Sequence, residues 1–184
     1  MALKSTIFKA DLQIADMDRQ YYDGHGLTIA RHPSETDERM MVRILAFVLH
    51  AHEALSFGKG LSTDDEPDLW QKDLTGAIEL WIDVGQPDEK RIMKACGRSN
   101  QVMIYSYSSM SNIWWNQIAS KVDRAKNLSV FNLPAATSQA LAKLAQRSMQ
   151  LQCTIQDGQV WINGEGESIQ IDLVQLKAPA DAAR

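Results

Sequence analysis

Cysteine and long apolar runs are scarce in this sequence, and both shortages limit what the protein can be. The 184 residues include only Cys96 and Cys153, far apart and outside any paired spacing. This excludes a disulfide framework and a thiolate zinc site, and it predicts that both side chains are small core hydrophobes. No apolar run reaches the length of a membrane span, and the N-terminus lacks the long apolar segment of a secretion signal. We therefore expect a cytoplasmic protein with no membrane partner.

The sequence also lacks an excess of positive charge. Its formal net charge is -4, which argues against a broad surface that coats nucleic acid, although a local basic groove stays possible. Hydrophobic residues make up 45% and charged residues 23%, as in an ordinary globular protein. The length fits one domain, which we expect to span residues 1–177 and to be followed by a flexible tail at 178–184.

Hydrophobic patterning and turn residues divide the chain into alternating strands and helices. Asp23–Gly26 predicts a turn within an N-terminal ribbon, Ser34 and Asp37 match a capping box, and Asp157-Gly158 is a strong signal for a type I′ hairpin. Strands are predicted at 3–15, 27–31, 55–61, 76–85, 101–107, 128–133, 149–156, 159–163 and 168–177, and 62–68 is an acidic loop. Helices are predicted at 34–53, from Pro87 to about Gly97, from Ser109 or Ser111 through Ile118, and at 137–147.

The strand at 76–85 is the most informative segment. Side chains alternate along a strand, so Glu79, Trp81 and Asp83 share one face while the aliphatic residues share the other. Carboxylates on a strand flanked by packing helices are costly unless they are paired or bind a cation. Glu79 is equally well explained as a cross-strand partner, whereas Asp83 interrupts an otherwise apolar strand and indicates a polar cluster.

The order of elements predicts the fold class. A strand, a short helix and a second strand occur twice in succession, which is typical of crossovers between parallel strands. The ribbon and the hairpin at the two ends contribute antiparallel strands. We therefore expect an α/β (α+β) protein with a mixed β-sheet and packing helices, an N-terminal β-ribbon and a C-terminal β-hairpin.

Three motifs carry a family resemblance that extends over nearly the whole chain. They are the segments Arg31–Met41, Leu80–Gly85 and Pro87–Glu89. With these motifs the chain resembles the YaeQ family of small bacterial proteins, whose core is a variant of the PD-(D/E)XK nuclease superfamily. The resemblance to active nucleases covers the central half, and it implies a restriction-endonuclease-like core that gathers carboxylates for Mg²⁺.

The resemblance assigns roles to individual acids. Asp83 matches the strand acid, and Asp68, in the pair Pro67-Asp68, matches the isolated aspartate, with Asp65 and Glu66 close enough to substitute. Glu38 matches the helix acid that some subgroups add. Asp37 points more directly into the apolar face of this helix, but it is also expected to cap the helix, so Glu38 is preferred as the acid of the site. The implied Mg²⁺ ligands are Glu38, Asp68 and Asp83, since carboxylates supply the hard oxygen ligands of this ion.

The chain departs from the nuclease pattern at Gly85, where active members have the lysine that activates water. In some superfamily members the cation lies on the neighbouring helix, and Lys94 is spaced to return toward Asp83, with Lys90 and Arg91 as rivals. The resemblance therefore names Asp83, Asp68 and Lys94 as candidate catalytic residues.

Candidate phosphate contacts are Lys90, Arg91 and His32, and a loop-capping role is the alternative for His32. The leading hypothesis is phosphodiester hydrolysis of nucleic acid with Mg²⁺ as cofactor. Because Gly85 stands where active members have lysine, the sequence does not decide whether the protein is an enzyme. The alternatives are an inactive nuclease fold that binds nucleic acid or protein as a regulatory module, and a scaffold with a buried polar cluster.

Overall fold

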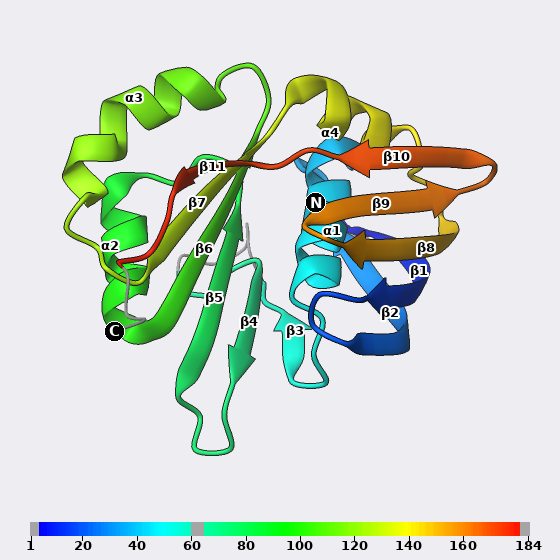
Figure 1. The fold of residues 1–184 in the computed structure, drawn as a ribbon, viewed down its shortest axis with the longest axis horizontal. Helices are drawn as coiled ribbons and strands as arrows, with labels where there is room; N and C mark the ends of the chain where they lie inside the picture. The colour runs from blue at the N-terminus through cyan, green and yellow to red at the C-terminus, as the bar shows by residue number, and fades with distance from the viewer. Residues whose placement is uncertain (1–3, 60–64, 181–184) are drawn as a thin grey trace. The chain divides into compact units, whose positions relative to one another are not determined.

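The computed structural model describes residues 4–59 and 65–180, which form four helices and eleven strands (Figure 1). The predicted mixed α/β class is confirmed. The chain folds as two compact units: the first comprises Met1–Val48 and Ala136–Asp172, and the second Leu49–Ala135 and Leu173–Arg184. In the part of the chain that is described, no helix is long and apolar enough to cross a membrane.

The first unit is built on a five-stranded sheet with the order β10-β9-β8-β1-β2. Only the β1–β8 pair is parallel, and the other neighbours are antiparallel. The strands are β1 (Thr6–Asp16), β2 (Tyr21–Arg31), β8 (Ser148–Gln156), β9 (Gln159–Gly164) and β10 (Glu167–Ile171). Because β1 pairs with β8, the predicted ribbon and hairpin are two parts of one sheet and not separate additions.

The chain reversal between β1 and β2 lies at residues 17–20, so the turn predicted at Asp23–Gly26 is wrong. Gly24 and Gly26 instead lie within β2, directly opposite Gln13 and Asp11 of β1. Glycine predicted a turn here because it is rare in strand interiors, but long pairing with β1 holds the segment extended.

The predicted hairpin turn between β8 and β9 is confirmed. Asp157 has φ 52° and Gly158 has φ 75°, the two positive angles that a type I′ turn requires. Asp18 stabilises this turn, since its carboxylate accepts hydrogen bonds from the Asp157 and Gly158 amides at 2.7 and 2.8 Å.

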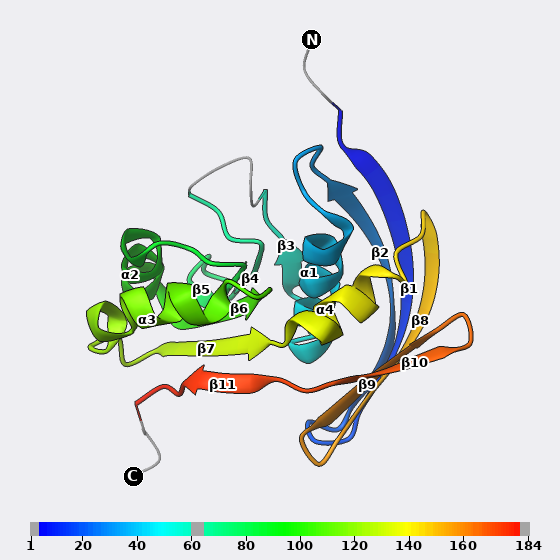
Figure 2. The ribbon, with the colours of Figure 1, turned by 90° about the horizontal axis from the view of Figure 1, so that it is seen from above.

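Two helices belong to this unit, α1 (Asp37–Leu49) and α4 (Ala135–Ala142), and both are shorter than predicted. The cap of α1 is Thr36, whose Oγ1 accepts from the Arg39 amide at 3.1 Å, so the predicted Ser34 cap is wrong. Figure 2 shows α1 beside β1 and β2, and the His25 ring of β2 meets the Phe47 ring of α1 edge-on at 5.1 Å. As predicted, α1 packs its apolar side chains against a sheet.

A buried ion-pair cluster anchors the start of α1. Glu35 is 6% exposed, and its Oε1 and Oε2 accept from Arg43 Nη2 at 2.6 Å and Arg43 Nε at 2.8 Å. Arg39 Nη1 donates to Oε2 at 2.7 Å, and Arg43 Nη2 also donates to the Ala30 carbonyl of β2 at 3.2 Å. The cluster thus links the loop before the helix, the helix itself and the sheet.

The second unit holds a six-stranded sheet with the order β11-β7-β6-β5-β4-β3 (Figure 1). The neighbours β5–β6 and β6–β7 are parallel, which confirms the two predicted crossovers, and the other pairs are antiparallel. The strands are β3 (Leu55–Phe57), β4 (Leu69–Lys72), β5 (Ile78–Val84), β6 (Ser99–Tyr107), β7 (Leu128–Leu133) and β11 (Val174–Lys177).

Helices α2 (Glu89–Arg98) and α3 (Ser111–Val122) form the crossovers and share one apolar core with the sheet. On α3, Trp114 faces this core and is 9% exposed, while Trp115 is half-buried. The core residues are Trp81, Ile92, Ala95, Val102, Ile104, Trp114, Ile118, Val122, Ala125, Leu128 and Val130. The core holds Trp81 on the side of β5 that faces Ile92 and Ala95 of α2.

Two predicted strands differ from those observed. The segment 168–177 forms two strands in different sheets, since β10 pairs with β9 and β11 pairs with β7. The predicted strand at 55–61 is limited to β3, and residues 60–61 lie outside the described residues. Positions 62–64 of the acidic loop and 181–184 of the predicted tail also lie outside them.

Both cysteines are free, as predicted, with Cys153 buried and Cys96 partly buried. Burial raises the pKa of Cys96 to about 11, against a smaller opposing effect of Lys177, and raises the pKa of Cys153 to about 12. Burial also raises the pKa of Tyr105 above its usual range.

We expect the free energy of unfolding to fall as the pH rises from about 9 to about 11. In this window the unfolded thiols lose their protons while the folded thiols keep them, so the unfolded state binds fewer protons and is favoured. Urea unfolding at both ends of the window measures the effect. The Cys96→Ala/Cys153→Ala variant should show a smaller decline, and an equal decline in the two proteins would contradict the assignment to the thiols.

Candidate functional site

Asp83 of β5 is the centre of a buried polar cluster. It is 2% exposed, and both of its oxygens accept hydrogen bonds. Oδ2 accepts from Trp81 Nε1 at 3.1 Å and from Arg91 Nε at 2.8 Å, while Oδ1 accepts from Arg91 Nη2 at 3.1 Å. The acid on the apolar strand is therefore paired with a cation, as the cost of burying an unpaired charge requires.

Asp68 lies beside Asp83. The antiparallel register pairs Leu69 of β4 with Ile82 of β5, which places Asp68, directly before β4, at the same level as Asp83. Asp68 is 3% exposed, its Oδ2 accepts from the Val84 amide at 2.7 Å, and its own amide lies 3.4 Å from Asp83 Oδ1. The structure thus brings together the two acids that the sequence nominated first.

Arg91 is the cation that reaches Asp83, because the start of α2 directs it there. Asp88 caps the helix through a 2.8 Å bond from the Arg91 amide to its Oδ1, which places Arg91 in the first turn. Arg91 Nη2 also donates to the Glu66 carbonyl at 2.9 Å. The sequence named Arg91 only as a rival and as a phosphate contact. The segment Pro87-Asp88-Glu89 is a helix start signal. It could have shown where the helix begins and therefore favoured Arg91 as the side chain that faces Asp83.

Lys94 does not take the place of the missing lysine. Its Nζ donates to Asp65 Oδ1 at 3.0 Å, and this contact lowers the pKa of the Asp65 carboxyl. The backbone at Gly85 itself disfavours a lysine, although the space beside its Cα is open. Its φ of +109° is a conformation that favours glycine, and its amide donates to the Tyr105 carbonyl at 2.8 Å. Lys90 lies on the exposed surface of α2.

Glu38 and His32 belong to the first unit, whereas Asp68, Asp83 and Arg91 belong to the second. Glu38 Oε2 accepts from Ser138 Oγ at 2.5 Å. His32 Nδ1 lies 2.7 Å from Ser34 Oγ and accepts from the Ser34 amide at 3.1 Å, which is the loop-capping geometry that was the alternative to a phosphate contact.

These side chains do not fit a preformed Mg²⁺ site. Both oxygens of Asp83 already accept from Arg91, and one oxygen of Asp68 accepts from a backbone amide. Within residues 4–59 and 65–180, no group of three or more His, Cys, Asp or Glu side chains is arranged to hold a metal ion. In this cluster the Arg91 guanidinium neutralises the buried Asp83 carboxylate, and the bonds between the two side chains link β5 to α2.

Comparison with known proteins decides the family. The family model described as YaeQ protein matches residues 1–173. The chain belongs to the YaeQ family. Its relatives in Salmonella typhi and Escherichia coli K12 are named as uncharacterised YaeQ proteins. They are 45% and 44% identical over 181 residues, which is 98% of this chain and all of each relative.

Two solved YaeQ structures are similar to this chain. The protein from Xanthomonas axonopodis pv. citri has a TM-score of 0.91 and 48% identity, covering 95% of this chain and 99% of that one. The protein from Pseudomonas syringae has the same TM-score and 36% identity, covering 95% and 97%. The YaeQ resemblance predicted from the three motifs is therefore confirmed. The names of these YaeQ proteins state no activity, so the function has to be argued from the site.

Proposed function

We propose that this YaeQ protein is a nuclease-like fold whose carboxylate site is closed by Arg91, and that it acts as a protein-binding regulatory module and not as a nuclease. The observation that carries the proposal is the two-point bond from Arg91 Nε and Nη2 to the two oxygens of Asp83. A guanidinium in this position supplies the positive charge that a metal ion would otherwise supply, and it occupies the same space.

The relation to the PD-(D/E)XK core is part of the proposal. It is supported by one acid directly before β4 and another on its antiparallel neighbour β5, followed by the crossover helix α2 and the parallel strand β6. A side chain from α2 supplies the cation, as in superfamily members whose cation lies on the neighbouring helix. Here that side chain is Arg91, which stays protonated and cannot act as a general base.

The surface of the second unit favours a protein partner over nucleic acid. On α2, Lys94 pairs with Asp65 and Arg98 Nη1 donates to the Asp65 carbonyl at 3.2 Å. By contrast, residues 108–120 contain no charged side chain, and there Met110 and Ile113 are 54% and 53% exposed. Depletion of charge around exposed apolar side chains is typical of the core of a protein interface.

A cleavage assay tests the proposal. Wild type and the Asp83→Asn variant are incubated with supercoiled DNA, single-stranded DNA and RNA in Mg²⁺ and in Mn²⁺. We expect no cleavage by wild type above the level of the variant. Cleavage that wild type performs and a folded Asp83→Asn protein does not would overturn the proposal.

Metal binding provides a second readout. Calorimetric titration with Mn²⁺ should detect no binding by wild type, and weak binding by Arg91→Met, in which the carboxylates are released. The matched control is Arg98→Met on the same helix, which leaves Asp83 paired. Equal Mn²⁺ binding by all three proteins would show that Arg91 does not close the site.

Fluorescence anisotropy with labelled DNA and RNA tests the partner class. We expect the protein to bind neither the labelled DNA nor the labelled RNA at physiological salt. Salt-dependent binding that is lost in Lys90→Ala/Lys94→Ala would reassign the partner to nucleic acid.

Metal-dependent phosphodiester hydrolysis is the second candidate function. One observation favours it, namely the convergence of Asp68 and Asp83, both buried, at one level of β4 and β5. Under this alternative, Arg91 would have to leave Asp83 when metal and substrate bind, so wild type would bind Mn²⁺ in the titration above.

A further inference from the structure

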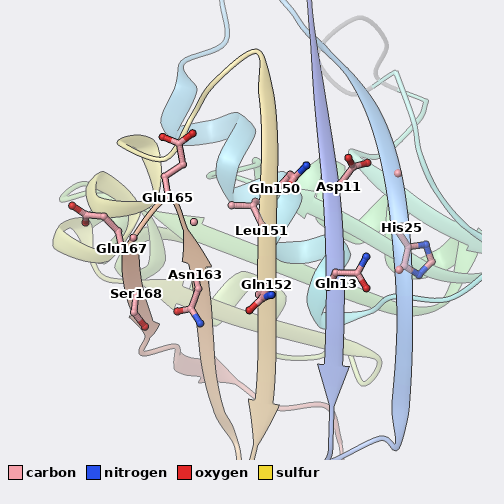
Figure 3. Close-up of a pocket in the computed structure, with 14 residues that line it drawn as sticks. Asp11, Gln13, His25, Gln150, Leu151, Gln152, Asn163, Glu165, Glu167 and Ser168 are labelled. Carbon is pink, nitrogen blue, oxygen red and sulfur yellow. The ribbon is translucent and has the colours of Figure 1, made fainter.

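The first unit carries a groove on the sheet face that points away from its core (Figure 3). Its volume is about 870 Å³, and its lining comes from all five strands and the β9–β10 turn. Along β1, buried Ala10, Leu12 and Ile14 alternate with exposed Asp11 and Gln13, so the groove lies on the solvent side of the sheet. The described lining residues all belong to the first unit, whereas Asp83 and Arg91 belong to the second.

A row of uncharged hydrogen-bonding side chains crosses the middle of this groove. The register places Gln13 of β1 beside Gln152 of β8, Gln152 beside Asn163 of β9, and Asn163 beside Ser168 of β10. Figure 3 shows these four side chains in one row. Carboxamides both donate and accept hydrogen bonds without carrying charge, so three neighbouring ones form a continuous neutral recognition surface.

The row retains unmet hydrogen-bonding capacity. Among the described residues, none donates to Oδ1 of Asn163, although this oxygen is buried. A half-turn about the Cβ–Cγ bond exchanges this oxygen with the amide nitrogen of the same side chain. Buried acceptors are rarely left without a donor, so the Asn163 side chain retains hydrogen-bonding capacity in either orientation.

Glycines keep the β2 end of the row open. Gly24 lies opposite Gln13, and a Cβ at Gly24 would lie 3.0 Å from Gln13 Nε2. Gly26 lies opposite Asp11, and a Cβ there would lie 3.5 Å from Asp11 Oδ1. Gly24 thus lets the Gln13 side chain lie over β2, whereas a Cβ at Gly26 would make only an ordinary contact with Asp11.

The charges around the groove exclude a polyanion. Asp11, Glu165 and Glu167 line it, and none of its described lining residues is lysine or arginine. The His25 ring is directed toward α1, where it contacts Phe47, and it lies within hydrogen-bonding distance of Tyr21 Oη. A phosphate-rich ligand would be repelled here, whereas hydroxyl groups can donate to the carboxylates and exchange both kinds of hydrogen bond with the carboxamides.

Aromatic side chains continue the same face. A second hollow of about 390 Å³ shares Gln13, Gly24 and Gln152 with the groove and adds Tyr22, which is 62% exposed. Trp161 of β9 is half-buried, pairs with Thr154 of β8, and lies two residues from Asn163, on the same face. Aromatic rings offer an apolar surface to the C–H faces of a pyranose ring, while the neighbouring amides meet its hydroxyl edges.

We propose that this face is a binding site for a neutral saccharide chain. Gln13, Gln152 and Asn163 bind its hydroxyl groups, Asp11 accepts from hydroxyls at the edge, and Tyr22 and Trp161 contact its sugar rings. The two adjoining hollows give room for more than one sugar unit along the strands.

Titration of the ¹⁵N-labelled full chain with neutral hexasaccharides tests the proposal. The probes are maltohexaose, cellohexaose and chitohexaose, with hexalysine and a thymidine hexanucleotide as charged comparisons. We expect at least one saccharide to shift the amide signals of β1, β8 and β9 around the groove, and the hexanucleotide to shift none of them. Binding of hexalysine alone would overturn the proposal and assign the groove to cationic peptides, and binding of none of the probes would also overturn it.

Matched variants on the same strand check the location. Gln152→Ala should weaken saccharide binding about tenfold, as expected for the loss of one or two hydrogen bonds. Gln156→Ala is the control, since Gln156 is exposed on the same strand, four residues away, and does not line the groove. Equal affinity of the two variants would contradict the proposed site.

Discussion

Replacement of Asp83 by alanine is expected to lower the free energy of unfolding of the second unit by about 3 kcal/mol. The substitution leaves the Arg91 guanidinium without its carboxylate and removes the acceptor of Trp81 Nε1. The Arg91 side chain is 24% exposed, so water can solvate part of its guanidinium in the variant. We therefore expect a loss of stability at the lower end of the range for a broken buried ion pair. Urea unfolding followed by tryptophan fluorescence measures it, since Trp70, Trp81, Trp114 and Trp115 lie in this unit.

Lys94→Ala is the matched control for that experiment. It removes the Lys94–Asp65 pair, whose side chains are 57% and 78% exposed, and exposed pairs of this kind contribute about 0–1 kcal/mol. A loss at Asp83→Ala no larger than that at Lys94→Ala would show that the Asp83–Arg91 pair does not stabilise the unit. The double variant Asp83→Leu/Arg91→Met should recover most of the loss, because it removes both charged partners of the pair.

Replacement of Glu35 by alanine is expected to cost about 4 kcal/mol in the first unit. Two arginines depend on this carboxylate, and the Arg43 and Arg39 side chains are 9% and 14% exposed. Without Glu35, both guanidinium groups lose the carboxylate that they share and stay partly desolvated beside each other. Thermal unfolding followed by circular dichroism measures the loss, and Glu35→Gln should fall between wild type and alanine because it keeps an acceptor but loses the charge.

Asp37→Ala tests whether burial causes this effect. Asp37 also pairs with an arginine, Arg31, but its side chain is 46% exposed. We expect this variant to lose no more than about 1 kcal/mol. A loss at Asp37→Ala as large as that at Glu35→Ala would assign the effect to charge near the start of α1 and not to the buried cluster.

The local elements of the second unit followed from the sequence. Alternation along β5 predicted that Asp83 and Trp81 share one face, and the strand and helix order predicted the parallel pairs β5–β6 and β6–β7. These predictions succeeded because each depends on a few adjacent residues or on the handedness and reach of a short connection.

The choice of Arg91 over Lys94 did not follow from spacing alone. The residue that a helix directs toward a strand depends on the residue at which the helix begins, and Asp88 sets that start. A displacement of one residue rotates every side chain by about 100°. Glu35 was missed for a similar reason, because only the folded loop brings it to Arg43, eight residues further along the chain.

The sequence by itself determined the α/β class, the YaeQ family and the presence of a polar cluster around Asp83. Tertiary structure alone decided that β1 pairs with β8, that residues 168–177 divide between two sheets, and that Gln13, Gln152, Asn163 and Ser168 form one row. Alternating hydrophobicity specifies which face of a strand is buried, but it does not specify which strand becomes the neighbour. That choice depends on packing between residues more than a hundred positions apart, and the polar groove depends on that choice.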